Sequence, residues 1–422
     1  MRLSRIAEQT STPPILMVAA RINEKIARGE QFFNFTVGDF DPCIYPIPGE
    51  LTEAVIGQYR DHQTNYPGAP GLEPLRQGVS RLIEHAASVN YDADEIQISS
   101  GSRPLIYAMY RSVVDPGDKV VYPVPSWMND AYCHLCGAVG VPVDTSASNN
   151  FMPTAEALEP HLGDAAMLAL CSPQNPTGTV FKRDQLKDIC DLVVAENKRR
   201  PAGSKPLYVM FDQVYWLLTF DGIEYPHPVN LCPDIRDFVL FADGLSKSFA
   251  GTGVRVGWAS GPRHLIKSVS DIIAYVGAWA PKPEQRAVAQ YLDDLNQVDA
   301  FLNGFRHRLS QRLTTIHEGF EAMKTRGLDV EAISPMAGIY LTVRIPLLGK
   351  RTSKGQVLNS SNDALDYLLD EARVGVIPFS FFGASDQSEW YRISVGTCDE
   401  SVIPEFLNNL ETSLDRLDGR LE

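Results

Sequence analysis

Two of the apolar runs in this sequence end in side chains that could carry chemistry. Asp212 follows the run 207–211, with Tyr215 three residues later, and Lys247 follows the run 238–242 within a loop rich in Gly and Ser. A lysine can act as a nucleophile, and an aspartate can face a cation. Taken singly, each has an ordinary interpretation, with Asp212 as a cap or turn residue and Lys247 as a solvated strand end.

Two further runs end in sequences that could hold an anion. Run 95–99 leads into Ser-Gly-Ser-Arg at 100–103 and then a helical pattern, and backbone N–H groups at a helix start favour phosphate. Arg255, eight residues after Lys247, adds a cation. Run 165–170 leads into a segment that contains Asn175-Pro176. In isolation these segments would be an ordinary capped helix and a good turn.

The elements that position these residues are near-continuous apolar runs of strand length. Strands buried on both faces have this pattern, so we expect a mainly parallel sheet covered by helices. In such sheets ligands bind beyond the carboxyl ends of the strands, where the candidate residues stand. The six expected strands are residues 95–99, 119–122, 140–143, 165–170, 207–211 and 238–242.

The length of 422 residues and the order of the patterns predict one large and one smaller α/β domain. Helical periodicity dominates residues 266–327, and the last hundred residues contain enough strands and helices for a smaller unit. We expect a large domain at 49–296. The small domain is expected to combine residues 1–48, which include an N-terminal arm, with residues 297–422.

Charge and cysteine usage narrow the class of protein. The 38 Lys and Arg against 52 Asp and Glu give a net charge of −14, which disfavours binding to nucleic acid or an anionic membrane. Seven scattered cysteines are typical of a reduced, cytoplasmic protein. Cys133 and Cys136 form half of a zinc spacing without a second pair, so we expect no metal site.

The order and spacing of the motifs are more specific than any one of them. Asn-Pro-x-Gly, Asp-x-x-Tyr, Ser-Lys with Arg eight residues on, and a late Tyr-Arg-Ile-Ser follow one another between Gly38 and Arg392. This pattern resembles the class I/II aminotransferases, which are fold-type I pyridoxal-phosphate enzymes. The resemblance implies their α/β fold, with a mainly parallel sheet in a large domain and a smaller α/β domain.

The resemblance also implies a pyridoxal 5'-phosphate site. Lys247 matches the lysine that forms the Schiff base with the cofactor aldehyde and then shuttles a proton. Asp212 matches the aspartate facing the pyridine nitrogen, and Tyr215 and Asn175 match residues that contact the ring hydroxyl oxygen. The implied catalytic residues are therefore Lys247, Asp212 and Tyr215.

Further matches imply how the rest of the cofactor is held. Phosphate contacts are implied for Arg255 and for Gly101, Ser102 and Arg103, and Trp127 matches the aromatic residue stacked on the ring. Tyr66 matches a tyrosine that reaches the phosphate from a neighbouring subunit, which implies a homodimer with shared active sites.

The implied substrate contacts involve Arg392, which matches the arginine that pairs bidentately with the α-carboxylate. Gly38 would add a backbone contact to that carboxylate, and Trp127 and Asn175 would also face the substrate. An arginine in a strand can instead form a salt bridge at a sheet edge, and the surrounding motif favours the functional interpretation.

Four positions depart from the pattern or leave a role open. Gly244 stands where many relatives have a phosphate-binding serine, which Ser246 could partly replace. Arg103 stands where others have a small residue, or a lysine that reaches the distal carboxylate of a dicarboxylic substrate, and a phosphate or solvent role is as good an interpretation. Lys282 is a second candidate for the distal carboxylate, with a plain surface lysine as the alternative.

The function implied is a pyridoxal-phosphate-dependent aminotransferase of the EC 2.6.1 type. It would move the α-amino group of an amino acid to a 2-oxo acid by a ping-pong Schiff-base mechanism, with aspartate and 2-oxoglutarate as the default pair. A lyase, synthase or decarboxylase on the same fold is the alternative, because the cofactor supplies the chemistry and the protein selects the bond that breaks. A regulator that only binds the cofactor is disfavoured, because the residues before Gly38 leave no room for a DNA-binding domain.

Overall fold

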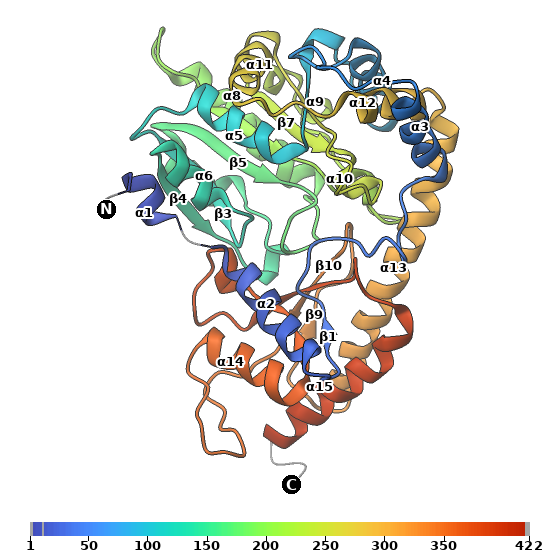
Figure 1. Ribbon diagram of the computed structural model, residues 1–422. Helices are drawn as coiled ribbons and strands as arrows, with labels where there is room; N and C mark the ends of the chain where they lie inside the picture. Colours follow the sequence, from blue (N-terminus) through green and yellow to red (C-terminus); the bar gives the residue numbers. More distant parts are fainter. Residues whose placement is uncertain (1–2, 11, 418–422) are drawn as a thin grey trace.

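The computed structural model describes residues 3–10 and 12–417, and this part contains a seven-stranded sheet in one lobe and a four-stranded and a two-stranded sheet in the other, with helices around both lobes (Figure 1). We call these parts the large lobe and the small lobe. The large-lobe sheet has the strand order β2-β8-β7-β6-β5-β3-β4. Its strands are β2 (Ile96–Ser99), β3 (Lys119–Val124), β4 (Val139–Asp144), β5 (Ala165–Cys171), β6 (Tyr208–Asp212), β7 (Val239–Gly244) and β8 (Gly257–Ser260).

The expected mainly parallel sheet is confirmed, since β4, β3, β5, β6 and β7 pair in parallel. The exception is β8, which pairs antiparallel with both β7 and β2. The sequence analysis missed β8, because its four residues Gly-Trp-Ala-Ser follow a glycine-rich loop and show neither alternation nor a long apolar run.

Both faces of the large sheet are buried, which explains the continuous apolar runs. Phe211 and Phe241 belong to a core shared with α8 (Arg183–Arg199), while Met210 and Ala242 belong to a second core with α5 (Ser102–Val113). Successive strand residues therefore serve opposite faces. The other helices around this sheet are α3 (Gly49–Arg60), α4 (Glu73–Ala87), α6 (Asn129–Cys136), α7 (Ala155–Leu162), α9 (Pro228–Leu231), α10 (Leu245–Ser248), α11 (Arg263–Val276) and α12 (Lys282–Tyr291).

The small lobe is built on a four-stranded sheet in the order β12-β13-β10-β9, with antiparallel pairing. Its strands are β9 (Glu331–Ala332), β10 (Tyr340–Arg344), β12 (Ile377–Pro378) and β13 (Trp390–Ser394), and β1 (Phe33–Asn34) pairs separately with β11 (Val374–Gly375). Its helices are α2 (Pro14–Ala27), α14 (Ser361–Tyr367) and α15 (Ile403–Leu417). The N-terminal segment and the C-terminal third thus lie together.

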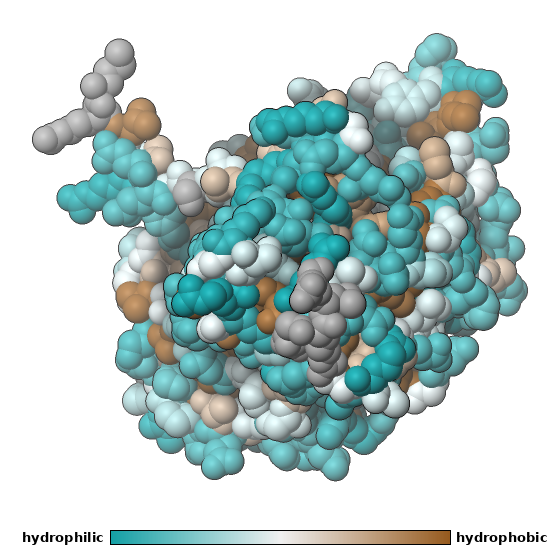
Figure 2. All heavy atoms as spheres, turned by 90° about the horizontal axis from the view of Figure 1, so that it is seen from below, coloured by the Kyte–Doolittle hydropathy of each residue, from teal (hydrophilic) through white to brown (hydrophobic). Residues whose placement is uncertain are grey.

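One long helix, α13 (Leu295–Thr325), runs along the side of both lobes (Figure 1). The short helix α1 (Arg5–Gln9) lies beside the large lobe, where the Ile6 carbonyl contacts the His134 ring at 3.1 Å. The face seen from the small-lobe side is mostly hydrophilic (Figure 2). None of the helices in the described part of the chain combines the length and apolar character that a membrane crossing requires.

Candidate active site

The candidate site lies where the carboxyl ends of the large-lobe strands face the small lobe. Asp212 ends β6 and pairs in register with Ala242 of the neighbouring strand β7, and Lys247 follows β7 in α10. Arg392 comes from β13 of the small lobe. The parallel sheet therefore brings Asp212 and Lys247 together at its strand ends, as expected, and the small lobe adds Arg392.

Lys247 reaches across to the small lobe. Its Nζ donates to the Gly38 carbonyl at 2.5 Å and lies 6.0 Å from the centre of the Tyr215 ring. The pKa of this amine is lowered from 10.5 to about 8, chiefly by burial; the charges of Arg392 and Arg103 contribute to the lowering, while Asp39 and Asp212 oppose it. The uncharged form, which a nucleophile or general base requires, is therefore far more populated near neutral pH than in an ordinary lysine.

Asp212 is a partly buried carboxylate without an ion-pair partner among residues 3–10 and 12–417. Its Oδ1 accepts a hydrogen bond from the Val214 amide at 3.1 Å. Burial raises its pKa to about 6, against the opposing effects of the Val214 amide and the Lys247 charge. At neutral pH the group is mostly ionised, so a cationic ligand atom would find its countercharge here.

An anion cradle is formed by Arg255 and the start of α5. The Arg255 guanidinium donates to the carbonyls of Thr252 at 2.7 Å and Ser100 at 2.8 Å, and it has no carboxylate partner in the described part of the chain. Gly101 adopts a φ of +86°, and a Cβ there would overlap the guanidinium. A Cβ on Gly257 would lie 2.7 Å from the Ser102 amide nitrogen. Both glycines are needed for this close approach.

Arg392 is 1% exposed and lies in a central strand, where it pairs in register with Thr342 and Ile377. Its Nη1 donates to Asn175 Oδ1 at 3.0 Å and its Nη2 to the Thr36 carbonyl at 2.7 Å, while Nε has no partner among the residues described. No carboxylate neutralises it within that set. Arg392 is therefore not a sheet-edge salt bridge but a buried cation whose fork can accept an anion.

Arg103 and Trp127 stand next to this group of charges. The Arg103 guanidinium lies over the Trp127 ring, 5.5 Å from its centre, and the Trp127 and Phe382 rings are 6.3 Å apart. Phe382 in turn lies 5.0 Å from the Arg392 guanidinium. Arg103 is exposed and has no hydrogen bond or ion pair with any described residue, which leaves its charge available to a ligand.

Tyr66 and Lys282 lie away from Lys247 within one chain, and Ser246, although it precedes Lys247 in α10, has no contact in the described part of the chain that shows its role. Tyr66 is 83% exposed and packs edge-on against Trp279 at 5.4 Å, and Lys282 donates to Asn65 at 2.6 Å; both line a surface hollow. Ser246 is partly exposed in α10, whereas the buried Ser248 hydroxyl lacks a partner among the residues described. The roles implied for Tyr66, Lys282 and Ser246 stay predictions.

The sequence analysis missed Tyr340, the first residue of β10. Its hydroxyl lies 2.9 Å from the Tyr215 hydroxyl, and its ring centre is 4.5 Å from the Arg392 guanidinium. A tyrosine in an apolar strand has no sequence signal that separates it from a core residue.

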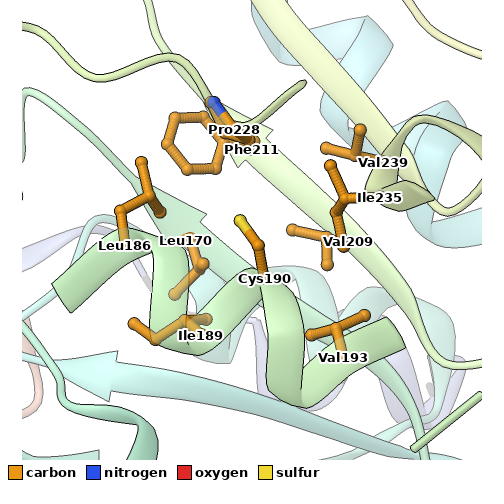
Figure 3. Close-up of a pocket in the computed structure, with 10 residues that line it drawn as sticks. All are labelled: Leu170, Leu186, Ile189, Cys190, Val193, Val209, Phe211, Pro228, Ile235 and Val239. Atoms are coloured by element: carbon orange, nitrogen blue, oxygen red, sulfur yellow. The ribbon is translucent and has the colours of Figure 1, made fainter. Parts of the chain in front are cut away.

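A small apolar cavity on the α8 side of the large sheet carries no comparable chemistry. It lies against α8 between residues such as Leu186, Cys190 and Phe211, and all ten lining side chains are apolar or cysteine (Figure 3). Phe211 faces this cavity, whereas Asp212, the next residue of the strand, faces the other side.

A family profile for aminotransferases of class I and II matches residues 43–410. This chain belongs to that family. It is 28% identical over 400 residues to the "Probable aspartate/prephenate aminotransferase" of Rickettsia bellii, covering 92% of this chain and 93% of the relative. It is 27% identical to the "Aspartate aminotransferase" of Rhizobium meliloti, covering 96% and 94%.

Solved structures agree with the fold. The crystal structure of the aspartate aminotransferase from Rhizobium meliloti has a TM-score of 0.89 and 25% identity, covering 99% of this chain and all of that one. The Thermus thermophilus aspartate aminotransferase with maleate has a TM-score of 0.85 at 24% identity, covering 98% of this chain and all of that one, and supports the fold alone. The aminotransferase assignment and the fold-type I architecture expected from the motifs are confirmed.

The lowered pKa of Lys247 predicts a distinctive reactivity in the cofactor-free protein. Its labelling by trace acetic anhydride should rise with pH with a midpoint at about 8, because only the uncharged amine reacts and burial favours that form. Mass spectrometry of digests measures the extent of labelling, with the exposed Lys267 as an internal reference for reagent activity. A Lys247 midpoint near 10.5 would contradict this account of the site.

Proposed function

We propose that this aminotransferase uses pyridoxal 5'-phosphate to transfer the amino group of aspartate to 2-oxoglutarate. The observation that carries the proposal is the set of charges in the site, since Lys247, Asp212, Arg255 and Arg392 have no ion-pair partner within residues 3–10 and 12–417. A dianionic cofactor with a basic ring nitrogen, together with an amino acid carboxylate, would supply the missing partners. The names of the relatives support aspartate as donor.

The residues present fit this cofactor. Asp212 would hold the ring nitrogen, Tyr215 and Asn175 the ring oxygen, and Trp127 the face of the ring. Arg255, with Gly101 and Ser102 at the start of α5, would hold the phosphate, and the glycines at 101 and 257 allow the guanidinium and the start of α5 to lie this close. Lys247 would provide the amine for covalent attachment. When bound, the cofactor supplies an aldehyde and a ring that stabilises negative charge at the substrate Cα.

The protein's own groups then act on the substrate. Arg392 binds the α-carboxylate through its planar fork, and Asn175 and the Thr36 carbonyl hold the guanidinium in place. The Lys247 Nζ would carry the proton that leaves the substrate Cα, and a pKa of about 8 suits a general base near neutral pH. The Gly38 carbonyl, which now accepts from Lys247, holds the amine at the residue to which a substrate carboxylate contact is assigned.

The position of Arg103 favours a substrate with two carboxylates. Its free guanidinium lies over Trp127, and its charge contributes to the lowered pKa of Lys247, so it acts on the same site. A substrate held by Arg392 at one carboxylate could present its second carboxylate to Arg103. Lys282 of a second chain is the other candidate for this contact.

The expected homodimer and domain division are also part of the proposal. Tyr66 and Lys282 line a surface hollow with Trp279, and a second chain on this face would bring Tyr66 toward the neighbouring phosphate. We propose residues 49–296 as the large domain, and 1–48 with 297–422 as the small one. A cytoplasmic location is proposed from the seven cysteines, none of which forms a disulfide in the described chain.

The half-reaction tests the proposed function directly. The cofactor-loaded enzyme mixed with aspartate, without an oxo acid, should release one equivalent of oxaloacetate per chain, with loss of the visible cofactor absorbance. Other donors serve as a panel, and Lys247→Ala should release none, because the proton-transferring amine is missing. Continuous release of ammonia or carbon dioxide would instead indicate a lyase or decarboxylase.

A second experiment tests the distal carboxylate contact. Arg103→Gln should raise the KM for aspartate and glutamate roughly fivefold, the equivalent of about 1 kcal/mol for an exposed charge pair, and leave aromatic donors unchanged. Steady-state kinetics across the donor panel measure the effect, with Lys282→Gln as the matched variant. A loss confined to Lys282→Gln would assign the contact to that residue. An equal loss for all donors, with weaker cofactor binding, would assign Arg103 to the phosphate.

A further inference from the structure

Tyr340 contacts three groups of the site from the small lobe. It is 2% exposed, its hydroxyl lies 2.9 Å from the Tyr215 hydroxyl, and its ring is 4.5 Å from the Arg392 guanidinium. The same hydroxyl lies so close to Gly38 that a side chain at that position would overlap it. Tyr340 therefore touches the tyrosine, arginine and glycine to which the cofactor and substrate contacts are assigned.

The surrounding backbone is shaped to admit the two tyrosines. Gly178, at φ +70°, lies against the Tyr340 carbonyl, where a Cβ would overlap it. Gly338, at φ +69°, would place a Cβ 3.1 Å from the Tyr215 ring. Glycine accepts these positive φ angles without strain, so residues without a side chain allow a close approach to the Tyr340 backbone and to the Tyr215 ring.

The direction of the hydrogen bond between the two hydroxyls follows from their proton count. Each phenol has one proton to donate. If Tyr215 donates its proton to the cofactor ring oxygen, Tyr340 must be the donor between the two tyrosines. Burial raises the pKa of both hydroxyls, with that of Tyr215 well above its ordinary value, so both stay protonated at neutral pH.

We propose that Tyr340 is a positioning residue with two functions. Its O–H donates to the Tyr215 oxygen and directs the Tyr215 proton toward the cofactor, and its ring supports the Arg392 guanidinium that binds the substrate carboxylate. The first function rests on the proposed cofactor, whereas the second rests only on the contact with Arg392. Hydrogen bonds in such a chain polarise one another, so loss of the Tyr340 hydroxyl weakens the bond that Tyr215 donates.

The Tyr340→Phe variant tests the hydroxyl. A weaker bond from Tyr215 stabilises the negative ring oxygen less. The midpoint of the pH-dependent change in the visible absorbance of the cofactor-loaded enzyme should therefore lie roughly half a pH unit to one unit higher than in wild type. The dissociation constant of maleate should stay unchanged, because the ring remains beside Arg392. An absorbance transition at the wild-type pH would overturn the function of the hydroxyl.

The Tyr340→Leu variant tests the ring. It should weaken maleate binding roughly 3- to 30-fold, the range for loss of a cation–π contact between exposed and desolvated settings. Unchanged maleate affinity would overturn the proposal that the Tyr340 ring supports the Arg392 guanidinium. Tyr391→Phe is the matched control, because Tyr391 is a buried tyrosine of the same sheet whose hydroxyl has no partner among the residues described. It should leave both readouts at their wild-type values.

The two proposals fail in different ways. A wild-type enzyme that gains no visible absorbance with pyridoxal phosphate contradicts the proposed function. A normal wild-type spectrum with an unshifted Tyr340→Phe transition overturns only the positioning function of the hydroxyl. Circular dichroism of each variant against Tyr391→Phe separates a loss of folding from a loss of positioning.

Discussion

The site depends on buried charge that has no ion-pair partner in the part of the chain that the structure describes. Arg392 is almost fully buried and has only an amide oxygen and a backbone carbonyl to accept its hydrogen bonds, and its Nε has no partner among the described residues. Placing an ion in such a setting without a countercharge is costly. The fold tolerates this cost because neutral acceptors and aromatic faces surround the guanidinium, and a ligand carboxylate completes the arrangement.

The contacts that hold the reactive groups join the two lobes. Lys247 of the large lobe donates to Gly38 beside the small lobe, Asn175 of the large lobe accepts from Arg392, and Tyr215 meets Tyr340. The geometry of the site is thus set by how the lobes meet rather than by either sheet alone. A change in the packing of the lobes would therefore alter the positions of the Lys247 amine, the Arg392 guanidinium and the Tyr215–Tyr340 hydroxyl pair together.

From the sequence we could predict the site residues that stand at strand ends or within the ordered motifs. Asp212 and Lys247 follow apolar runs that became β6 and β7, and the late Tyr-Arg pair became a central strand. Strand β8 and Tyr340 were missed, because four residues after a glycine-rich loop and a tyrosine among apolar neighbours have no distinguishing pattern. Tyr391, next to Arg392 in the same sheet, is buried and has no polar partner for its hydroxyl among the described residues, so residue type alone does not separate a core tyrosine from Tyr340.

The central claim is that ligand charges complete the buried charges of the site, and calorimetric unfolding tests it most directly. Wild type and Arg392→Gln are each heated with pyridoxal phosphate, with and without maleate. The cofactor should raise the Tm of both proteins. Maleate at about 100 times its Kd should add about 2.7 kcal/mol of stability to wild type alone. An equal maleate increment in Arg392→Gln would contradict the account.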